Sequence, residues 1–293
     1  GGAVGLELPA GLQWLRAMPG GAAWHDRLPQ LASECADQWR LVLGPPFADS
    51  NASLVVQAGD AVLKINFPDP ETEHEPDALR TWNGDCAVRL LAYDAERRAL
   101  LLERCLPGTT LWELDDDGAG EVVSGLLPRL WKPPPPGIRS LSNVANRWSE
   151  DLPVSWEAAG QPFERALLDT ALTALRELAP TQGPLVLSNE DFHAGNVLRS
   201  RREPWLAIDP KPIAAEREFT LVAMIRDRKG EVLGGPRPLA RLRRRLDRLS
   251  ADLGLDRERV HRWTIAHTLV WGFEPDGSYH AAHAEIARLL VDA

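Results

Sequence analysis

Three polar residues in the second half of the chain have side chains and spacing that suit phosphoryl transfer. Asp191 precedes Asn196 by five positions, and a short apolar run over residues 205–208 ends at Asp209. An aspartate can bind the hydroxyl group that attacks a phosphate, while an asparagine and a second aspartate supply oxygen ligands for Mg²⁺ on nucleotide phosphates. We therefore expect a loop with Asp191 and Asn196 beside a strand that ends at Asp209. A hairpin with incidental polar residues is the alternative.

Lys64, in the first half of the chain, fits the same chemistry. It lies in the apolar run 61–67, where an ammonium group is costly to bury unless it binds a carboxylate or a ligand. A lysine that binds nucleotide phosphates is often paired with a glutamate on the following helix. We favour Glu75 as this partner, because it shares one face of the predicted helix with apolar side chains. Glu71 and Glu73 remain alternatives, and so does an unpaired lysine on an edge strand.

The predicted elements place these residues in an α+β fold with two lobes. The spacing of apolar residues predicts helices over 8–43, with Pro29 starting or kinking the second of them. Strands 54–57 and 61–67 follow, joined by a turn at 58–60. A helix at 71–82 and strands at 88–92 and 99–103 complete the order. We expect an N-lobe over residues 1–105 with N-terminal helices, an antiparallel sheet and the nucleotide-covering loop. The mainly helical C-lobe, residues 106–293, would hold the catalytic loop, the metal site and the acceptor pocket. A stiff proline-rich linker is expected at 132–137, and an amphipathic helix at 239–246.

The composition and net charge of the chain limit the classes of function that it can have. The chain has 293 residues, of which 44% are hydrophobic and 26% charged, as in ordinary globular proteins. No apolar run approaches the ~20 residues that span a membrane. The net charge of −9 argues against a nucleic-acid binder and suits a cationic second substrate.

The cysteines and the chain start indicate a cytoplasmic protein. The three cysteines are far apart without a Cys-x-x-Cys pair, so we expect reduced thiols. His280 and His283 could share a helix face, but no other ligand lies nearby in sequence and a zinc site is not expected. The first five residues lack a methionine and a basic segment, so we expect a trimmed terminus rather than a secretory signal.

Several segments together resemble the aminoglycoside phosphotransferase superfamily, in particular its branch of streptomycin 6-kinases and hydroxyurea-resistance kinases. The resemblance covers about residues 47–271, and its most specific parts are 61–64, 99–105, 191–198, 203–212 and 216–219. The sequence Asp-Pro-Lys-Pro at 209–212 is more diagnostic than the kinase pattern itself, because protein kinases have Asp-Phe-Gly there.

The resemblance implies a protein-kinase-like bilobal fold and the transfer of a phosphoryl group from ATP, with Mg²⁺, to a hydroxyl group of a small molecule. Asp191 would orient the acceptor hydroxyl and accept its proton. Asn196 and Asp209 would bind Mg²⁺. Lys64, paired with Glu75, would bind the nucleotide phosphates.

Other nucleotide contacts are implied in the same way. Lys211 would reach the transferred phosphate, the alternative being an exposed charge between two prolines. The hinge, residues 103–106 with Glu103 and Cys105, would read adenine through backbone groups. The covering loop 48–53 contains no glycine, and its phosphate contacts would come from hydroxyl or backbone amide groups of Ser50, Asn51 and Ser53.

Three positions near Asp191 depart from the common pattern or leave their role open. Asn189 stands where many relatives have a histidine, and we expect altered loop support without loss of chemistry. Glu190 adds a second carboxylate beside Asp191, and repulsion between the two could raise one pKa. For His193 we favour a hydrogen bond that orders the loop over direct catalysis.

The resemblance also indicates an acceptor. Streptomycin or a related guanidinylated aminocyclitol is expected, with 6-phosphorylation that confers antibiotic resistance. The acidic side chains available for a cationic acceptor are Glu216, Glu218, Glu274 and Asp276. Hydroxyurea or another small metabolite is the alternative substrate, and a nucleotide-binding pseudokinase regulator is the alternative class. We expect a monomer without nucleic-acid or membrane partners. ATP and GTP are both open as donors.

Overall fold

A four-stranded antiparallel sheet forms the centre of the first lobe. The computed structural model describes residues 6–293, and the strand order in this sheet is β1-β2-β4-β3. The strands are β1 Ser53–Ala58, β2 Ala61–Asn66, β3 Leu90–Asp94 and β4 Ala99–Glu103. Lys64 on β2 lies opposite Val55 of β1 and Leu100 of β4. It therefore sits on a central strand, not on an edge.

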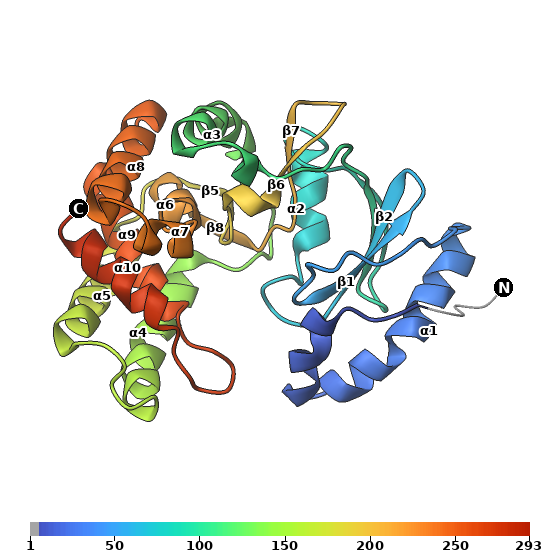
Figure 1. The fold of residues 1–293 in the computed structure, drawn as a ribbon, viewed down its shortest axis with the longest axis horizontal. Coiled ribbons are helices and arrows are strands. Elements are labelled where there is room, and N and C mark those ends of the chain that lie inside the picture. Colours follow the sequence, from blue (N-terminus) through green and yellow to red (C-terminus); the bar gives the residue numbers. More distant parts are fainter. Residues whose placement is uncertain (1–5) are drawn as a thin grey trace.

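The N-terminal segment covers the face of the sheet that points away from the helical lobe (Figure 1). It forms the 3₁₀ helix η1, Ala10–Ala17, and the helix α1, Gly21–Trp39. Pro29 lies inside α1, so of the two alternatives predicted for it, the start of a helix is wrong. The small core between this segment and the sheet contains Leu12, Leu15, Trp24, Leu28, Leu31, Ala32, Cys35, Leu54, Val56, Leu63, Ile65, Phe67 and Ala99.

Helix α2, Glu75–Trp82, lies on the other side of the sheet, toward the helical lobe (Figure 1). It begins later than residue 71, the predicted start, and Pro76 occupies its first turn, where the missing N–H has no helical partner to lose. Trp82 donates its indole N–H to the carbonyl oxygen of Leu130 at 2.9 Å. The larger hydrophobic core contains Leu79 and Leu100 together with C-lobe residues as far as Leu290. It thus crosses the predicted lobe boundary at residue 105.

The C-lobe is mainly helical. Its α-helices are α3 Asp116–Leu130, α4 Leu141–Ala158, α5 Arg165–Leu178, α6 Val222–Ile225, α7 Lys229–Gly234, α8 Pro238–Leu253, α9 Arg257–Val270 and α10 Ala281–Val291. Its 3₁₀ helices are η2 Leu111–Glu113, η3 Ala179–Thr181, η4 Ala194–Asn196 and η5 Arg217–Leu221. Aspartates cap two of the longer helices, since Asp115 and Asp256 accept hydrogen bonds from backbone N–H groups in the first turns of α3 and α9. Within residues 6–293, no helix has the length and apolar character required to cross a membrane.

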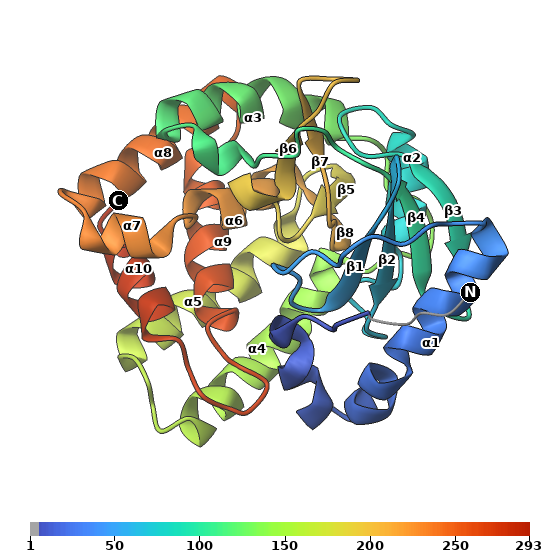
Figure 2. The same cartoon turned by 45° about the vertical axis from the view of Figure 1, so that its right-hand side comes forward.

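Two short antiparallel pairs lie between the N-lobe sheet and the C-lobe helices (Figure 2). One joins β5, Leu185–Asn189, to β8, Pro212–Glu216, and the other joins β6, Val197–Arg199, to β7, Trp205–Ala207. The predicted catalytic loop connects β5 to β6, and Asp209 lies in the link from β7 to β8. The two pairs therefore bring both segments to the junction of the lobes.

Candidate active site

Backbone hydrogen bonds hold the loop with Asp191 against the segment with Asp209. The Glu190 N–H donates to the carbonyl oxygen of Lys211 at 2.9 Å, and the Ile208 N–H donates to that of Asn196 at 2.9 Å. Each bond joins residues at or next to the predicted catalytic positions. The two bonds therefore hold the segment with Asp191 beside the segment with Asp209, although the two are far apart in sequence.

Asn189 adds a third link. Its side-chain oxygen accepts hydrogen bonds from the backbone N–H groups of Asp191 and Lys211, both at 2.9 Å. Asn189 is 7% exposed, which keeps water from competing for these bonds. Asparagine at this position therefore fixes the catalytic loop to the start of β8.

Asn196 and Asp209 offer oxygen atoms to a cation. The Asn196 amide nitrogen donates to the carbonyl oxygen of Asp191 at 2.9 Å, which leaves the amide oxygen as its free ligand atom. Asp209 adopts a left-handed backbone conformation, with φ of 51°, and its side chain is 46% exposed. An amide oxygen and a carboxylate are hard ligands that suit Mg²⁺. The two residues fit a magnesium ion that would neutralise charge on nucleotide phosphates.

Lys64 binds two carboxylates at once. Its ammonium nitrogen lies 2.8 Å from Glu75 Oε2 and 2.7 Å from Asp209 Oδ1. Burial disfavours the ammonium form, but Asp209 and Glu75 outweigh that effect and raise the pKa of Lys64. Of the three glutamates considered from the sequence, Glu75 is the one that contacts Lys64. The lysine is charged and points at the carboxylate predicted to bind metal.

A chain of buried hydrogen bonds fixes the orientation of Glu75. Asn66 donates to Glu75 Oε1 at 2.8 Å, and the Ser53 hydroxyl donates to the Asn66 side-chain oxygen at 2.7 Å. Ser53 was predicted to bind phosphate through its hydroxyl or backbone amide group, and its hydroxyl group here supports the Lys64–Glu75 pair through Asn66. In the covering loop above it, Ser50 is partly exposed and Asn51 is exposed.

Lys211 extends from the link to β8 toward the N-lobe. Its ammonium nitrogen lies 3.0 Å from Glu71 Oε2 and 4.8 Å from the centre of the Trp271 ring. Burial opposes its charge, but Glu71 and then Asp191 raise the pKa of Lys211. Lys211 is thus a partly buried cation near the catalytic loop, rather than an exposed charge between prolines.

Glu190 is bound by basic residues on both sides. It lies 2.8 Å from Arg139 and 2.8 Å from His267 Nε2, and it is 1% exposed. Burial acts to raise its pKa, but His267 and Arg139 outweigh burial and lower the pKa of Glu190 to about 2. The expectation that repulsion with Asp191 would raise this pKa is therefore wrong for Glu190. The contacts with His267 and Arg139 determine its pKa.

His193 connects the catalytic loop to an aromatic ring that the sequence did not reveal. Its Nδ1 accepts a hydrogen bond from the Gly195 N–H at 3.0 Å, so the proton of the neutral ring is on Nε2, 3.8 Å from Asp191 Oδ1. Trp112 stacks on the His193 ring at 5.4 Å between centroids. The Trp112 indole N–H donates to Asp227 Oδ2 at 2.9 Å. This arrangement orders the loop, in line with the role favoured from sequence.

The predicted hinge follows β4. The Glu103 carboxylate binds Arg202 at 2.6 Å and the Arg89 N–H at 2.8 Å, so this side chain is already occupied by the protein. Cys105 is 8% exposed, and burial raises the pKa of its thiol to about 11. Both positions would contribute to a nucleotide site through backbone groups alone.

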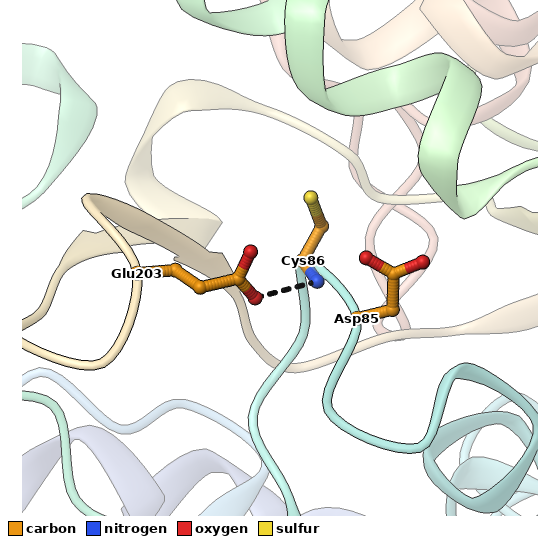
Figure 3. Close-up of side chains that lie close together, drawn as sticks. All are labelled: Asp85, Cys86 and Glu203. Carbon is orange, nitrogen blue, oxygen red and sulfur yellow. Dashed lines mark hydrogen bonds between the residues drawn. The ribbon is translucent and has the colours of Figure 1, made fainter.

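A second group of possible metal ligands lies near the hinge. Asp85, Cys86 and Glu203 bring their ligand atoms within 4.8 Å of one another (Figure 3). However, Arg129 contacts both carboxylates, and burial raises the pKa of the Cys86 thiol to about 11. Glu203 also accepts a hydrogen bond from the Cys86 N–H at 3.0 Å (Figure 3). These groups join the β6–β7 hairpin to the segment after α2, and their chemistry does not favour a metal.

The four acidic residues considered for the acceptor do not form one group. Glu216 is 1% exposed and binds Arg259 at 2.5 Å, so it is structural. Glu218 lines a separate surface cavity beside Trp131 and Arg217. Glu274 and Asp276 remain, in the loop between α9 and α10 that follows Trp271. Glu274 contacts His280, and Asp276 accepts a hydrogen bond from the Ser278 N–H.

The two lobes and the site at their junction define a kinase-like phosphotransferase. Solved structures share the fold: aminoglycoside phosphotransferase APH(4)-Ia, at 13% identity, gives a TM-score of 0.60 and covers 88% of this chain and 98% of that one. Choline kinase LicA from Streptococcus pneumoniae, at 12% identity, gives 0.58 and covers 90% and 99%.

Sequence comparison identifies the family. The family model for aminoglycoside/hydroxyurea antibiotic resistance kinases matches residues 38–274, and the chain belongs to this family. A streptomycin 6-kinase of Streptomyces glaucescens is 40% identical over 268 residues, which cover 88% of this chain and 87% of that protein. A hydroxyurea phosphotransferase of Kitasatospora aureofaciens is 38% identical over 306 residues, with coverage of 98% and 85%.

Proposed function

We propose that this protein transfers the γ-phosphoryl group of ATP, with Mg²⁺, to the 6-hydroxyl group of streptomycin. The observation that carries the proposal is the convergence of Asp191, Asn196, Asp209 and the Lys64–Glu75 pair at the lobe junction. The identity of 37–40% over most of the chain to streptomycin 6-kinases of two Streptomyces species supports the acceptor. A cytoplasmic monomer would suffice for this activity, since all of these residues come from one chain.

The residues divide the work between positioning and charge stabilisation. Asp191 would hold the acceptor hydroxyl in line with the leaving diphosphate and accept its proton. Lys64, oriented by Glu75, would bind the nucleotide phosphates. Asn196 and Asp209 would hold Mg²⁺, which supplies neutralising charge at the phosphates. Ser50 and Asn51 would cover the nucleotide, and the backbone of the hinge at 103–106 would bind its base.

The proposal is tested by ADP release from Mg·ATP in the presence of streptomycin, with NMR of the product to locate the phosphate. We expect streptomycin-dependent turnover that is lost in Asp191→Ala and kept in Asp169→Ala, a matched control at an exposed aspartate on α5. Phosphorylation at a hydroxyl group other than the 6-position would contradict the regiochemistry. Absence of turnover with streptomycin would contradict the acceptor.

Hydroxyurea is the second candidate acceptor, because the hydroxyurea phosphotransferase matches nearly the full chain. The two acceptors differ in charge, since streptomycin carries two guanidinium groups and hydroxyurea is neutral. Side-by-side turnover with both compounds under the same conditions decides between them. Under our proposal streptomycin gives the higher kcat/KM.

A further inference from the structure

Arg226, at the end of α6, is a buried cation. It is 4% exposed, and its Nη1 lies 2.7 Å from His267 Nδ1. Among residues 6–293 no carboxylate comes within ion-pair distance of its guanidinium group. Its other two nitrogens have no hydrogen-bond partner there, yet they are not among the side-chain atoms that are sealed from solvent. Each of these nitrogens therefore keeps some contact with solvent.

The Arg226 side chain is linked to the catalytic loop through His267. His267 Nε2 is 2.8 Å from Glu190 Oε2, and Glu190 directly precedes Asp191. The centre of the Trp271 ring is 5.3 Å from Arg226 Cζ and 4.8 Å from Lys211 Nζ. Two cations from separate segments thus lie against one indole ring, and Asp191 is close enough to favour the charged form of both.

His267 does not neutralise the charge of Arg226. Because Nδ1 of His267 accepts the hydrogen bond from Arg226, Nε2 carries the proton that Glu190 accepts. Burial, followed by Arg226, lowers the pKa of His267 to about 4, so the ring is neutral at pH 7 and offers Arg226 no negative charge. Glu190 is compensated by Arg139 at 2.8 Å. Burial lowers the pKa of Arg226 to about 10, and the charges of Asp191, Glu190 and Asp227 oppose that shift without an ion pair, so the guanidinium group stays charged at pH 7 and can bind an anion.

A planar guanidinium group with free N–H donors suits the oxygen atoms of a phosphoryl group. We propose that Arg226, together with Lys211, binds the phosphoryl group while it moves from ATP to the acceptor. This inference rests on the proposed phosphotransferase function. The bond between phosphorus and the acceptor oxygen forms, the bond between phosphorus and the bridging oxygen of ADP breaks, and the acceptor proton goes to Asp191. Arg226 stays protonated and stabilises charge on the transferred oxygens.

The test compares Arg226→Gln with Arg201→Gln, a matched control at an exposed arginine. Steady-state kinetics are measured with Mg·ATP and streptomycin, and slow Mg·ATP hydrolysis is measured with water as the acceptor. We expect Arg226→Gln to lower kcat about 100-fold and to change the KM for ATP less than about 3-fold. Hydrolysis should fall in parallel, and added guanidinium ion should restore part of both activities. Arg201→Gln should match the wild type.

The hydrolysis readout separates this inference from the choice of acceptor, because it needs no streptomycin. A wild-type hydrolysis rate in folded Arg226→Gln would overturn the inference even if streptomycin is phosphorylated. A loss confined to the KM for ATP or streptomycin, with kcat unchanged, would also overturn it. If Arg226→Gln does not fold, Arg226→Lys is the variant that tests the proposal. Lysine keeps the positive charge but lacks the planar guanidinium group, and we expect about 10-fold lower kcat. Wild-type kcat in that variant would reject the role.

Discussion

At the scale of single residues, close approach at Gly195 shapes the catalytic loop. Gly195 lies beneath the Trp112 indole, where a Cβ atom would collide with the ring. Trp112 cannot move away freely, because it stacks on His193 and donates a hydrogen bond to Asp227. The backbone of Gly195 is not in the left-handed conformation. Glycine is therefore required at this position because any side chain would collide with Trp112.

We expect Gly195→Ala to displace Trp112 and lower kcat about 10-fold or more, because misplacement of catalytic groups is costly. The matched control is Gly125→Ala on α3, where no atom lies within 4 Å of the added methyl group. That substitution should leave activity unchanged and stabilise the helix by up to about 1 kcal/mol. Steady-state kinetics and thermal unfolding of both variants check this. Equal activity of Gly195→Ala and the wild type would contradict the role assigned to Trp112.

The residues that sequence could predict are those whose chemistry is local in the chain. Asp191 and Asn196 share one loop, and Asp209 comes directly after the next hairpin, so spacing alone relates them. Trp112 and Arg226 reach the site through tertiary packing, from segments whose sequences carry no spacing relation to it. Ser53 shows another limit of the sequence, since its place in the expected loop did not reveal that its hydroxyl group bonds Asn66.

At the scale of elements, the β6–β7 hairpin is attached to the N-lobe. Arg202 in this hairpin binds Glu103 at the end of β4 at 2.6 Å, and it donates to the carbonyl oxygens of Gly84 at 2.7 Å and Ala87 at 3.0 Å. One side chain therefore holds the predicted hinge, the segment after α2 and the hairpin that leads to Asp209.

Arg202→Met should loosen this attachment and weaken nucleotide binding, with an increase of about 10-fold in the Kd for ATP, equivalent to about 1.4 kcal/mol. Arg201→Met, at the exposed neighbouring position, is the matched control and should bind ATP like the wild type. Isothermal titration calorimetry gives both values. An unchanged Kd in Arg202→Met would show that the hinge does not depend on the hairpin.

Most elements were predictable, and the errors have local causes. Alternating apolar residues gave the strands of the hairpin around Gly59 within one residue. The start of α2 was placed at residue 71 instead of 75, because periodicity extends into a turn in which Thr72 bonds Asp69. The segment 8–43 contains a 3₁₀ helix before α1, and a helical pattern does not distinguish these two helix types.

At the scale of the whole molecule, buried histidines make stability depend on pH. Burial lowers the pKa of His267 to about 4 and that of His283 to about 3, from the ordinary 6.5. A depressed folded-state pKa means that the unfolded chain binds protons more readily below pH 6.5. The stability that depends on His267 is therefore fully present above pH 6.5 and is lost as the pH falls toward 4. Glu190, whose pKa is lowered from 4.5 to about 2, adds a further loss as the pH falls below 4.5.

We expect wild-type protein to lose about 2 kcal/mol of unfolding free energy through His267 between pH 7.5 and 5.0. His267→Gln keeps a donor and an acceptor but does not titrate in this range. Between pH 7.5 and 5.0 this variant should lose about 2 kcal/mol less unfolding free energy than the wild type, even if its stability at pH 7.5 is lower. Urea unfolding at several pH values measures the slope. An identical slope in both proteins would contradict the assignment to His267.

The two cores of unequal size have a consequence for partial unfolding. The small core joins the N-terminal helices to one face of the sheet, whereas the larger core ties α2 and the other face to the C-lobe. Amide protons of α1 should therefore exchange with solvent before those of β2 and α9, as a separate cooperative unit. When α1 detaches, the apolar side chains of Leu54, Val56 and Leu63 become exposed on an intact sheet. That surface would favour self-association while the residues around Asp191 remain folded.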